Sequence, residues 1–376
     1  MEDLTRCFSA WRIIRAGNRE VVEALVAPEH RGPSPELAAA LARWPAARYW
    51  GRPDRSELVL VRPLGPDRPE RWVWHGALLL FTVLSALGAG AALVGRYFPA
   101  IPHQVSEIPR LGLALVPDFL RLPLTVWIEG WSFAVPLLGI LLVHELGHYL
   151  VARRYAIDAS LPFFLPVPPS VSPIGSLGAF LKLRSPVVDR RQLLDVGVAG
   201  PLAGFVVALG VLVWGYATST AIGGAGDAPR AYVEFAGYRI ALGDSLLTAA
   251  LRELLLPGAL AVHLSPPAFA GWAGMLITGL NLLPLSQLDG GHIAYGLIGR
   301  GQMPIGAAAL LGLVYLSQFW TPWLVWVVIT LVVGGWRWTH PSVLCPERSV
   351  PAGRRLLGWL CAMILAATFV PVPFGG

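Results

Sequence analysis

The chain has 376 residues, of which 55% are hydrophobic and only 14% are charged, whereas a soluble domain carries roughly 25% charged residues. This composition excludes an ordinary soluble protein and predicts apolar surface that faces lipid; the 15 tryptophans agree, because tryptophan is enriched at membrane interfaces. The formal charge of +6 is diffuse, without a basic stripe interleaved with aromatic residues, so nucleic acid is not an expected partner.

Residues 1–71 are mixed polar and charged and predict a small soluble α/β accessory domain. Short helices are expected at 21–26 and 35–47, and a strand at 56–62. The absence of an early apolar run argues against a cleaved secretory signal. The cysteines are far apart and form no CxxC pair, so neither a disulfide framework nor a cysteine zinc site is expected: Cys7, Cys345 and Cys361.

Residues 72–376 predict a polytopic membrane domain, since a helix needs about 20 apolar residues to cross the hydrocarbon core. The expected fold is all-α with about seven crossings and one re-entrant β-strand and loop element, because five prolines between 161 and 173 exclude a continuous helix and 179–183 resembles a strand. The predicted spans are 74–95, 130–150, 193–217, 266–288, two within 303–336 joined by a hairpin near 318–322, and 356–373.

Basic residues predict the orientation of these spans. One group lies between the second and third spans, and the other lies before the last span. The excess of Lys and Arg in cytoplasmic loops places both segments, and with seven crossings also the N-terminal domain, in the cytoplasm. The two groups are Arg153, Arg154, Lys182, Arg184, Arg190 and Arg191, and Arg337, Arg348, Arg354 and Arg355.

The second span ends in the sequence HELGH at 144–148, an H-E-x-x-H pattern. Residues four apart share one face of a helix, so His144 and His148 can bind a single ion. Glu145 points in a different direction and is placed to act as a general base toward water. Ionisable residues within an apolar span are costly, and a divalent cation would compensate that cost.

Catalytic zinc usually takes three protein ligands, and Asp289 is the expected third. It follows the fourth span, where Pro284 is expected to break the helix and Gly290 and Gly291 to permit a sharp turn. The predicted orientation places Asp289 and the histidine pair toward the same side. Three roles remain for His292: a helix-start residue, a hydrogen-bond donor that supports a ligand, or an alternative ligand.

These motifs resemble the site-2 protease family, the intramembrane zinc metalloproteases of the M50 type. The resemblance rests on HELGH and on N-x-x-P-x-x-x-x-D-G at 281–290, in the family's order, and covers a core of about 130–300. It implies that His144, His148 and Asp289 bind one zinc ion and that Glu145 activates water. It also implies a multi-pass protein of a prokaryotic cell membrane, and the orientation predicted from the basic residues places the active site toward the cytoplasm.

Two further segments are similar to the family branch of plastid proteases and their bacterial relatives: GSLGAF at 175–180 and DVGVAGPLAG at 195–204. A protease holds its substrate extended, and an exposed strand edge can pair with such a segment. The candidate substrate-binding residues are therefore Gly175, Ser176, Leu177, Gly178, Ala179 and Phe180, together with Pro284.

The expected function is a zinc metalloendopeptidase that cuts membrane-spanning segments of single-pass proteins, with the Asn281 side chain as a candidate oxyanion donor. The alternative is a membrane protein that binds metal without catalysis, a transporter or a scaffold. A prenyl-protein protease would take a Glu as third ligand, and a di-iron hydroxylase would need more clustered histidines than the 8 present.

Overall fold

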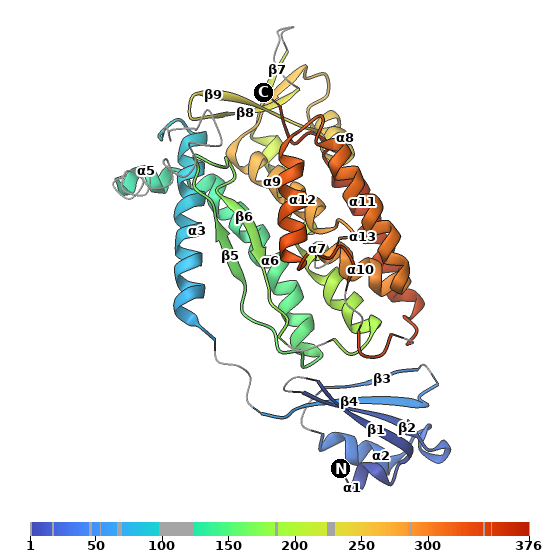
Figure 1. Ribbon diagram of the computed structural model, residues 1–376. Coiled ribbons are helices and arrows are strands. Elements are labelled where there is room, and N and C mark those ends of the chain that lie inside the picture. Colours follow the sequence, from blue (N-terminus) through green and yellow to red (C-terminus); the bar gives the residue numbers. More distant parts are fainter. Residues whose placement is uncertain are drawn as a thin grey trace.

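The computed structural model describes residues 2–16, 19–44, 47–52, 54–65, 70–97, 123–184, 187–223, 230–285, 288–340, 343–346 and 348–375. Figure 1 shows a body of long helices with one small sheet domain at the end that holds the N-terminus and another sheet at the end that holds the C-terminus. Helices dominate, as predicted, but a five-stranded sheet makes the all-α expectation for the membrane domain wrong.

The N-terminal domain is a four-stranded antiparallel sheet in the order β1-β2-β4-β3. The predicted strand near 56–62 and the start of the helix at 35 are confirmed, but the predicted helix at 21–26 is wrong, because this segment is β2. The elements are α1 (Glu2–Thr5), β1 (Phe8–Ala16), β2 (Arg19–Val26), η1 (Pro28–His30), α2 (Pro35–Ala42), β3 (Arg48–Trp50) and β4 (Glu57–Pro63).

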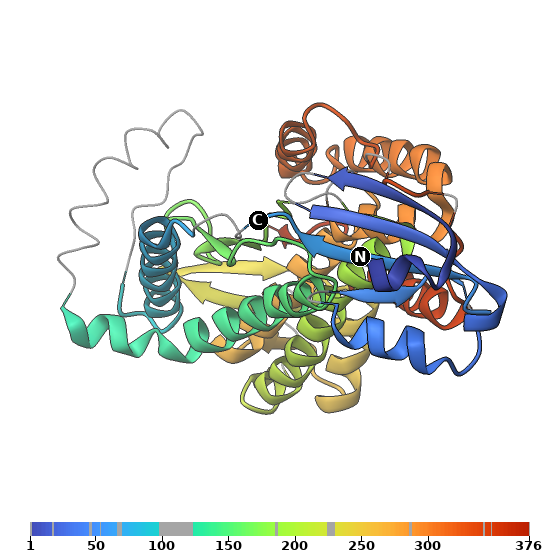
Figure 2. The same ribbon diagram turned by 90° about the horizontal axis from the view of Figure 1, so that it is seen from below.

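Strand β2 is buried on both faces, which explains the wrong helix prediction. Val22 and Leu60 pack toward α2 on the outer face, while Val21 and Val59 pack on the other face against a cluster that includes Val196. A strand buried on both faces is a continuous apolar run, which short-range periodicity does not distinguish from a helix. Seen from below in Figure 2, the N-terminal sheet lies over one end of the helical body.

A buried arginine joins this domain to the helical body. The Arg348 guanidinium lies 2.7 Å from Glu23, 2.8 Å from Glu57 and 3.3 Å from Asp189. Asp189 is the N-cap of α7 (Arg190–Ala217) and accepts a hydrogen bond from the Gln192 backbone N–H. The two basic segments of the predicted cytoplasmic side therefore meet at this end of the molecule.

Within the described residues, four helical segments are long and apolar enough to cross a bilayer. They are α3 (Trp72–Leu93), α6 (Trp131–Arg154), α7, and the segment Asp289–Leu316 that α10 (Asp289–Ile298), η3 (Gly299–Gly301) and α11 (Gln302–Leu316) form together. The shorter helices are α5 (Leu124–Glu129), α9 (Pro266–Asn281), α12 (Pro322–Val333) and α13 (Ala352–Thr368). Each predicted span thus contains a helix, and α11 and α12 are separated at the position of the predicted hairpin.

A five-stranded sheet at the opposite end was not predicted from the sequence. Its order is β11-β9-β8-β10-β7, and it pairs Phe374 near the C-terminus with Leu242. Strands of two to five residues carry little periodicity, and this pairing joins distant segments. The elements are β7 (Thr220–Ile222), β8 (Ala231–Phe235), β9 (Tyr238–Leu242), α8 (Leu246–Leu255), β10 (Ala261–His263) and β11 (Phe374–Gly375).

The predicted re-entrant element is a hairpin of β5 (Phe163–Pro166) and β6 (Ser176–Phe180), so its strand ends earlier than the predicted 179–183. The hairpin packs along α3, where the His75 ring stacks on Phe163 at 4.0 Å and the Ser85 hydroxyl donates to the Val167 carbonyl. In the described chain, β6 pairs with β5 alone. The other edge of β6 has no strand beside it there.

Candidate metal centre

Helix α6 places the three residues of the HELGH motif at one buried position. His144, Glu145 and His148 are all buried, although α6 is a candidate membrane span. The histidines are four residues apart and therefore project from one helix face. Their Nε2 atoms lie 3.2 Å apart, so both imidazoles point at the same small volume.

A break between α9 and α10 brings Asp289 to this volume. Helix α9 ends at Asn281, the chain passes Pro284 without helical structure, and α10 begins at Asp289. The predicted break is therefore confirmed. The predicted glycine turn is wrong, because Gly290 lies in the first turn of α10, where a Cβ would lie 1.9 Å from the Leu282 carbonyl oxygen. Gly290 is required for this close approach of the backbone.

The Asp289 carboxylate closes the group of three ligands. Its Oδ2 lies 3.1 Å from His144 Nε2 and its Oδ1 lies 3.2 Å from His148 Nε2. The three ligand atoms lie within 4.8 Å of one another. Two imidazole nitrogens and one carboxylate oxygen form a set typical of catalytic zinc, which leaves a coordination position for water.

The orientation of His148 is a second observation that fits a zinc ion at this site. The His148 Nδ1 atom lies 2.7 Å from the Val196 carbonyl oxygen, to which it can donate a hydrogen bond. That bond places the proton on Nδ1 and leaves the Nε2 lone pair directed toward Asp289 and His144. A backbone carbonyl that orients a ligating histidine in this way is a recurring feature of zinc sites.

Helix α7 approaches the histidines through glycines. A Cβ on Gly200 would lie 2.1 Å from His148 Nε2, and one on Gly204 would lie 2.9 Å from His144 Nδ1. Sequence reasoning assigned these glycines no role in the site, although small residues four apart are a signal for close helix packing in membranes. They leave room for both imidazoles between α6 and α7.

We expect Gly200→Ala to lower zinc affinity by at least about 10–100-fold, the range seen when groups that orient metal ligands are altered. The added methyl group overlaps the His148 ring, which must rotate away from Asp289. The matched control is Gly210→Ala on the same helix, where a Cβ meets nothing within 4 Å. Zinc titration of both variants checks this expectation, and equal affinities would contradict it.

Glu145 and Asn281 complete the surroundings of the ligands. The Glu145 carboxylate interacts electrostatically with His148, His144 and Asp289, and its Oε2 atom is buried without a hydrogen-bond partner among the described residues. The Asn281 Nδ2 atom lies 3.5 Å from His144 Nε2. A carboxylate oxygen and an amide donor are therefore both beside the ligand group.

The remaining candidate residues, Gly178, Pro284 and His292, lie outside the group of three ligands. Within β6, Gly178 has a φ of +103° and a Cβ there would lie 3.7 Å from Ile277, one turn before Asn281 on α9. Pro284 instead lines an apolar cavity of about 180 Å³ between α10, α11 and α13. His292 is outside the group of three ligands, and its ring lies 4.8 Å from that of His340.

Comparisons with known proteins agree with these motifs. The family model of peptidase family M50 matches residues 132–315. The chain is 33% identical over 276 residues to "Probable zinc metalloprotease EGY2, chloroplastic" of Arabidopsis thaliana, which covers 71% of this chain and 46% of that protein. It is 28% identical over 312 residues to "Probable zinc metalloprotease EGY1, chloroplastic" of the same plant, covering 82% and 55%.

The chain thus spans about half the length of these two relatives. Their names place them in chloroplasts, which differs from the prokaryotic cell membrane expected for this chain. No solved structure matches significantly. The M50 model covers the helices that carry the histidines and Asp289. The chain therefore belongs to peptidase family M50, the site-2 protease family.

Proposed function

We propose that this chain is an intramembrane zinc metalloendopeptidase that hydrolyses peptide bonds within membrane-spanning segments. The observation that carries the proposal is the convergence of His144 and His148 from α6 with Asp289 from α10. The names of the relatives, both zinc metalloproteases, support the same reaction. A zinc ion held by these three residues would supply Lewis-acid chemistry, which polarises a carbonyl and lowers the pKa of water to about 7.

Glu145 is the general base of the proposed reaction. Its unpaired Oε2 accepts the proton of the attacking water, and the carboxyl group then delivers that proton to the nitrogen of the leaving amine. Asn281 Nδ2 donates a hydrogen bond to the oxygen on which negative charge develops. Both roles follow from the position of each side chain beside the ligand group.

Strand β6 is the proposed substrate-binding element. A membrane-spanning segment must unwind before its amides can reach catalytic groups, and an extended segment can then pair with a strand edge. The β6 edge away from β5 carries no strand in the described chain, and Gly178 packs beside α9 one turn from Asn281. The contact of Gly178 with α9 supports a substrate role for β6, whereas Pro284 borders a separate cavity.

The proposed substrates are single-pass membrane proteins, cut in regulated intramembrane proteolysis. We propose seven crossings, formed by α3, α6, α7, α9, the segment of α10 with α11, α12 and α13. The N- and C-termini lie at opposite ends of the helical body, which supports an odd number of crossings (Figure 1). Basic segments at the end with the N-terminal domain support a cytoplasmic location for that end. We retain a prokaryotic cell membrane as the proposed location on the resemblance to bacterial members.

The direct test is cleavage of a single-pass reporter by the purified full-length chain in lipid vesicles with zinc. Chelation should abolish cleavage, and added zinc should restore it, because the site supplies no other Lewis acid. Products should map within the membrane-spanning segment of the reporter. Cleavage confined to exposed loops would contradict the proposed substrate class.

The group of His144, His148 and Asp289 is called the core site below. We expect the Asp289→Asn variant to lose zinc from the core site and to lose cleavage with it. The substitution removes the one anionic ligand of the group, while the amide keeps the size of the side chain. Zinc per chain, measured by elemental analysis, should fall by one equivalent relative to wild type. Full zinc occupancy of the core site in this variant would show that another residue is the third ligand, as in the prenyl-protein protease alternative.

A further inference from the structure

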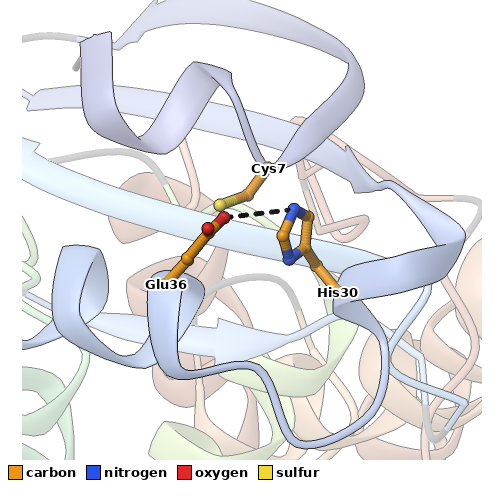
Figure 3. A group of neighbouring side chains, drawn as sticks. All are labelled: Cys7, His30 and Glu36. Carbon is orange, nitrogen blue, oxygen red and sulfur yellow. Dashed lines mark ion pairs between the residues drawn. The ribbon is translucent and has the colours of Figure 1, made fainter.

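A second group of potential metal ligands lies in the N-terminal domain, away from the core site. Cys7 lies between α1 and β1, His30 is the last residue of η1, and Glu36 lies in the first turn of α2. Figure 3 shows the three side chains pointing toward one another from these separate elements. Their ligand atoms lie within 4.8 Å of one another. We propose that Cys7, His30 and Glu36 bind a second zinc ion, which stabilises the N-terminal domain.

The chemistry of the three side chains favours zinc. A thiolate and an imidazole suit zinc better than magnesium or calcium, which prefer oxygen ligands. Ligand distances of about 2.0–2.3 Å around a tetrahedral zinc place ligand atoms roughly 3.3–3.8 Å apart. Glu36 is exposed whereas Cys7 is buried, so the Glu36 side chain can make the small adjustment that closes the group.

The distance between His30 and Glu36 fits a bridging ion better than a direct contact. His30 Nε2 lies 3.9 Å from Glu36 Oε2, which is too long for a hydrogen bond. The same separation is close to that of two ligands of one tetrahedral zinc. The open side of the group faces solvent at Glu36, so water can take the fourth coordination position.

A serine holds the histidine in the orientation that zinc requires. The His30 Nδ1 atom lies 2.8 Å from Ser34 Oγ, which also accepts a hydrogen bond from the Leu37 backbone N–H as the N-cap of α2. In the tautomer in which Nδ1 donates to Ser34, the Nε2 lone pair faces Glu36 and Cys7. Such a bond to the second ring nitrogen is the usual support of a zinc-bound histidine.

The location explains what the ion would do. A domain of about 70 residues has little core of its own, and small scaffolds often gain stability from a structural metal. Here one ion would join the start of β1 and η1 to α2, which packs on the outer face of the sheet. This role is independent of the proposed proteolysis, because the ligands belong to a different domain.

Cobalt substitution distinguishes the two sites, since the core site contains no sulfur ligand. The full-length chain, purified in detergent and loaded with Co2+, should show a near-ultraviolet thiolate-to-cobalt charge-transfer band. The band should persist in Asp289→Asn, disappear in Cys7→Ser, and persist in the control Cys361→Ser, whose thiol is buried in another cluster. Loss of core zinc or of cleavage alone would leave this result unchanged.

Zinc analysis gives a second readout that does not depend on a cysteine variant. Glu36→Gln changes an exposed side chain and should weaken N-terminal zinc binding at least tenfold, while core zinc and cleavage stay as in wild type. Absence of the charge-transfer band in wild type, its survival in Cys7→Ser, or unchanged zinc binding in both N-terminal variants would overturn the proposal. An ordinary His30–Glu36 ion pair would produce those outcomes.

Discussion

Replacing Glu145 by Gln is expected to lower the rate of peptide-bond cleavage by about 10²–10⁴-fold, the usual contribution of a positioned general base. Gln has nearly the same shape but cannot take a proton from water at the position of the buried Oε2. Glu145 is not one of the three ligand residues, so the variant should keep its core zinc. Cleavage of a reporter in vesicles, measured beside zinc per chain, checks both halves of this expectation.

The matched control is Glu253→Gln, which makes the same chemical change at an exposed carboxylate on α8. It should cleave at the wild-type rate. A Glu145→Gln variant that cleaves as fast as wild type would favour a transporter or scaffold that binds metal without catalysis. A variant that loses core zinc would instead make Glu145 a ligand.

Replacing Arg348 by Ala is expected to destabilise the contact between the N-terminal domain and the helical body by about 3–5 kcal/mol, the cost of removing one partner of a buried ion pair. The Arg348 side chain is only 5% exposed, and its loss leaves Glu23, Glu57 and Asp189 without their shared cation. Faster cleavage of the full chain by an added soluble protease, at sites in the N-terminal domain, measures this loss of docking.

Two variants test whether charge explains the effect. Arg337→Ala removes an exposed guanidinium from the same connecting segment and should leave the protease pattern unchanged. Adding Glu23→Gln to Arg348→Ala should recover part of the loss, because one of the unpaired carboxylates becomes neutral. A double variant no better than Arg348→Ala alone would show that Arg348 acts through packing.

The same contact should weaken in acid. Burial raises the pKa of Glu23, but the hydrogen bonds from Cys345 and Arg12 and the charge of Arg348 outweigh it and hold that pKa below its ordinary value. A carboxyl whose pKa is lowered in the folded state stabilises fully above its unfolded value of about 4.5 and loses that contribution as pH falls through the folded value. Protease sensitivity should therefore rise below about pH 4.5 in wild type and change less in Glu23→Gln.

Spacing along the sequence was sufficient to predict the long apolar helices and much of the candidate site. Four residues separate His144 from His148, and this spacing alone places them on one helix face. Pro284 predicted the break before Asp289, since proline cannot continue a helix. Apolar runs predicted the positions of helices, and each predicted span contains one, because lipid requires internally hydrogen-bonded helices.

Other features depend on contacts between segments distant in the sequence. Residues 21–26, predicted as a helix, form a strand whose second face is buried against the helical body. The sheet that pairs Phe374 with Leu242 has no local signature. The proximity of Cys7, His30 and Glu36, on which the proposed second zinc site rests, is not visible in their spacing along the chain.

The amino-acid sequence by itself therefore determined the membrane class, the long apolar helices and the identification of His144, Glu145, His148 and Asp289 as candidate site residues. Only the tertiary structure decided that Asp289 meets the histidines and that Gly200 makes room for His148. The physical reason is that periodicity encodes which face of a helix a residue occupies, whereas the packing of one helix against another encodes which faces meet.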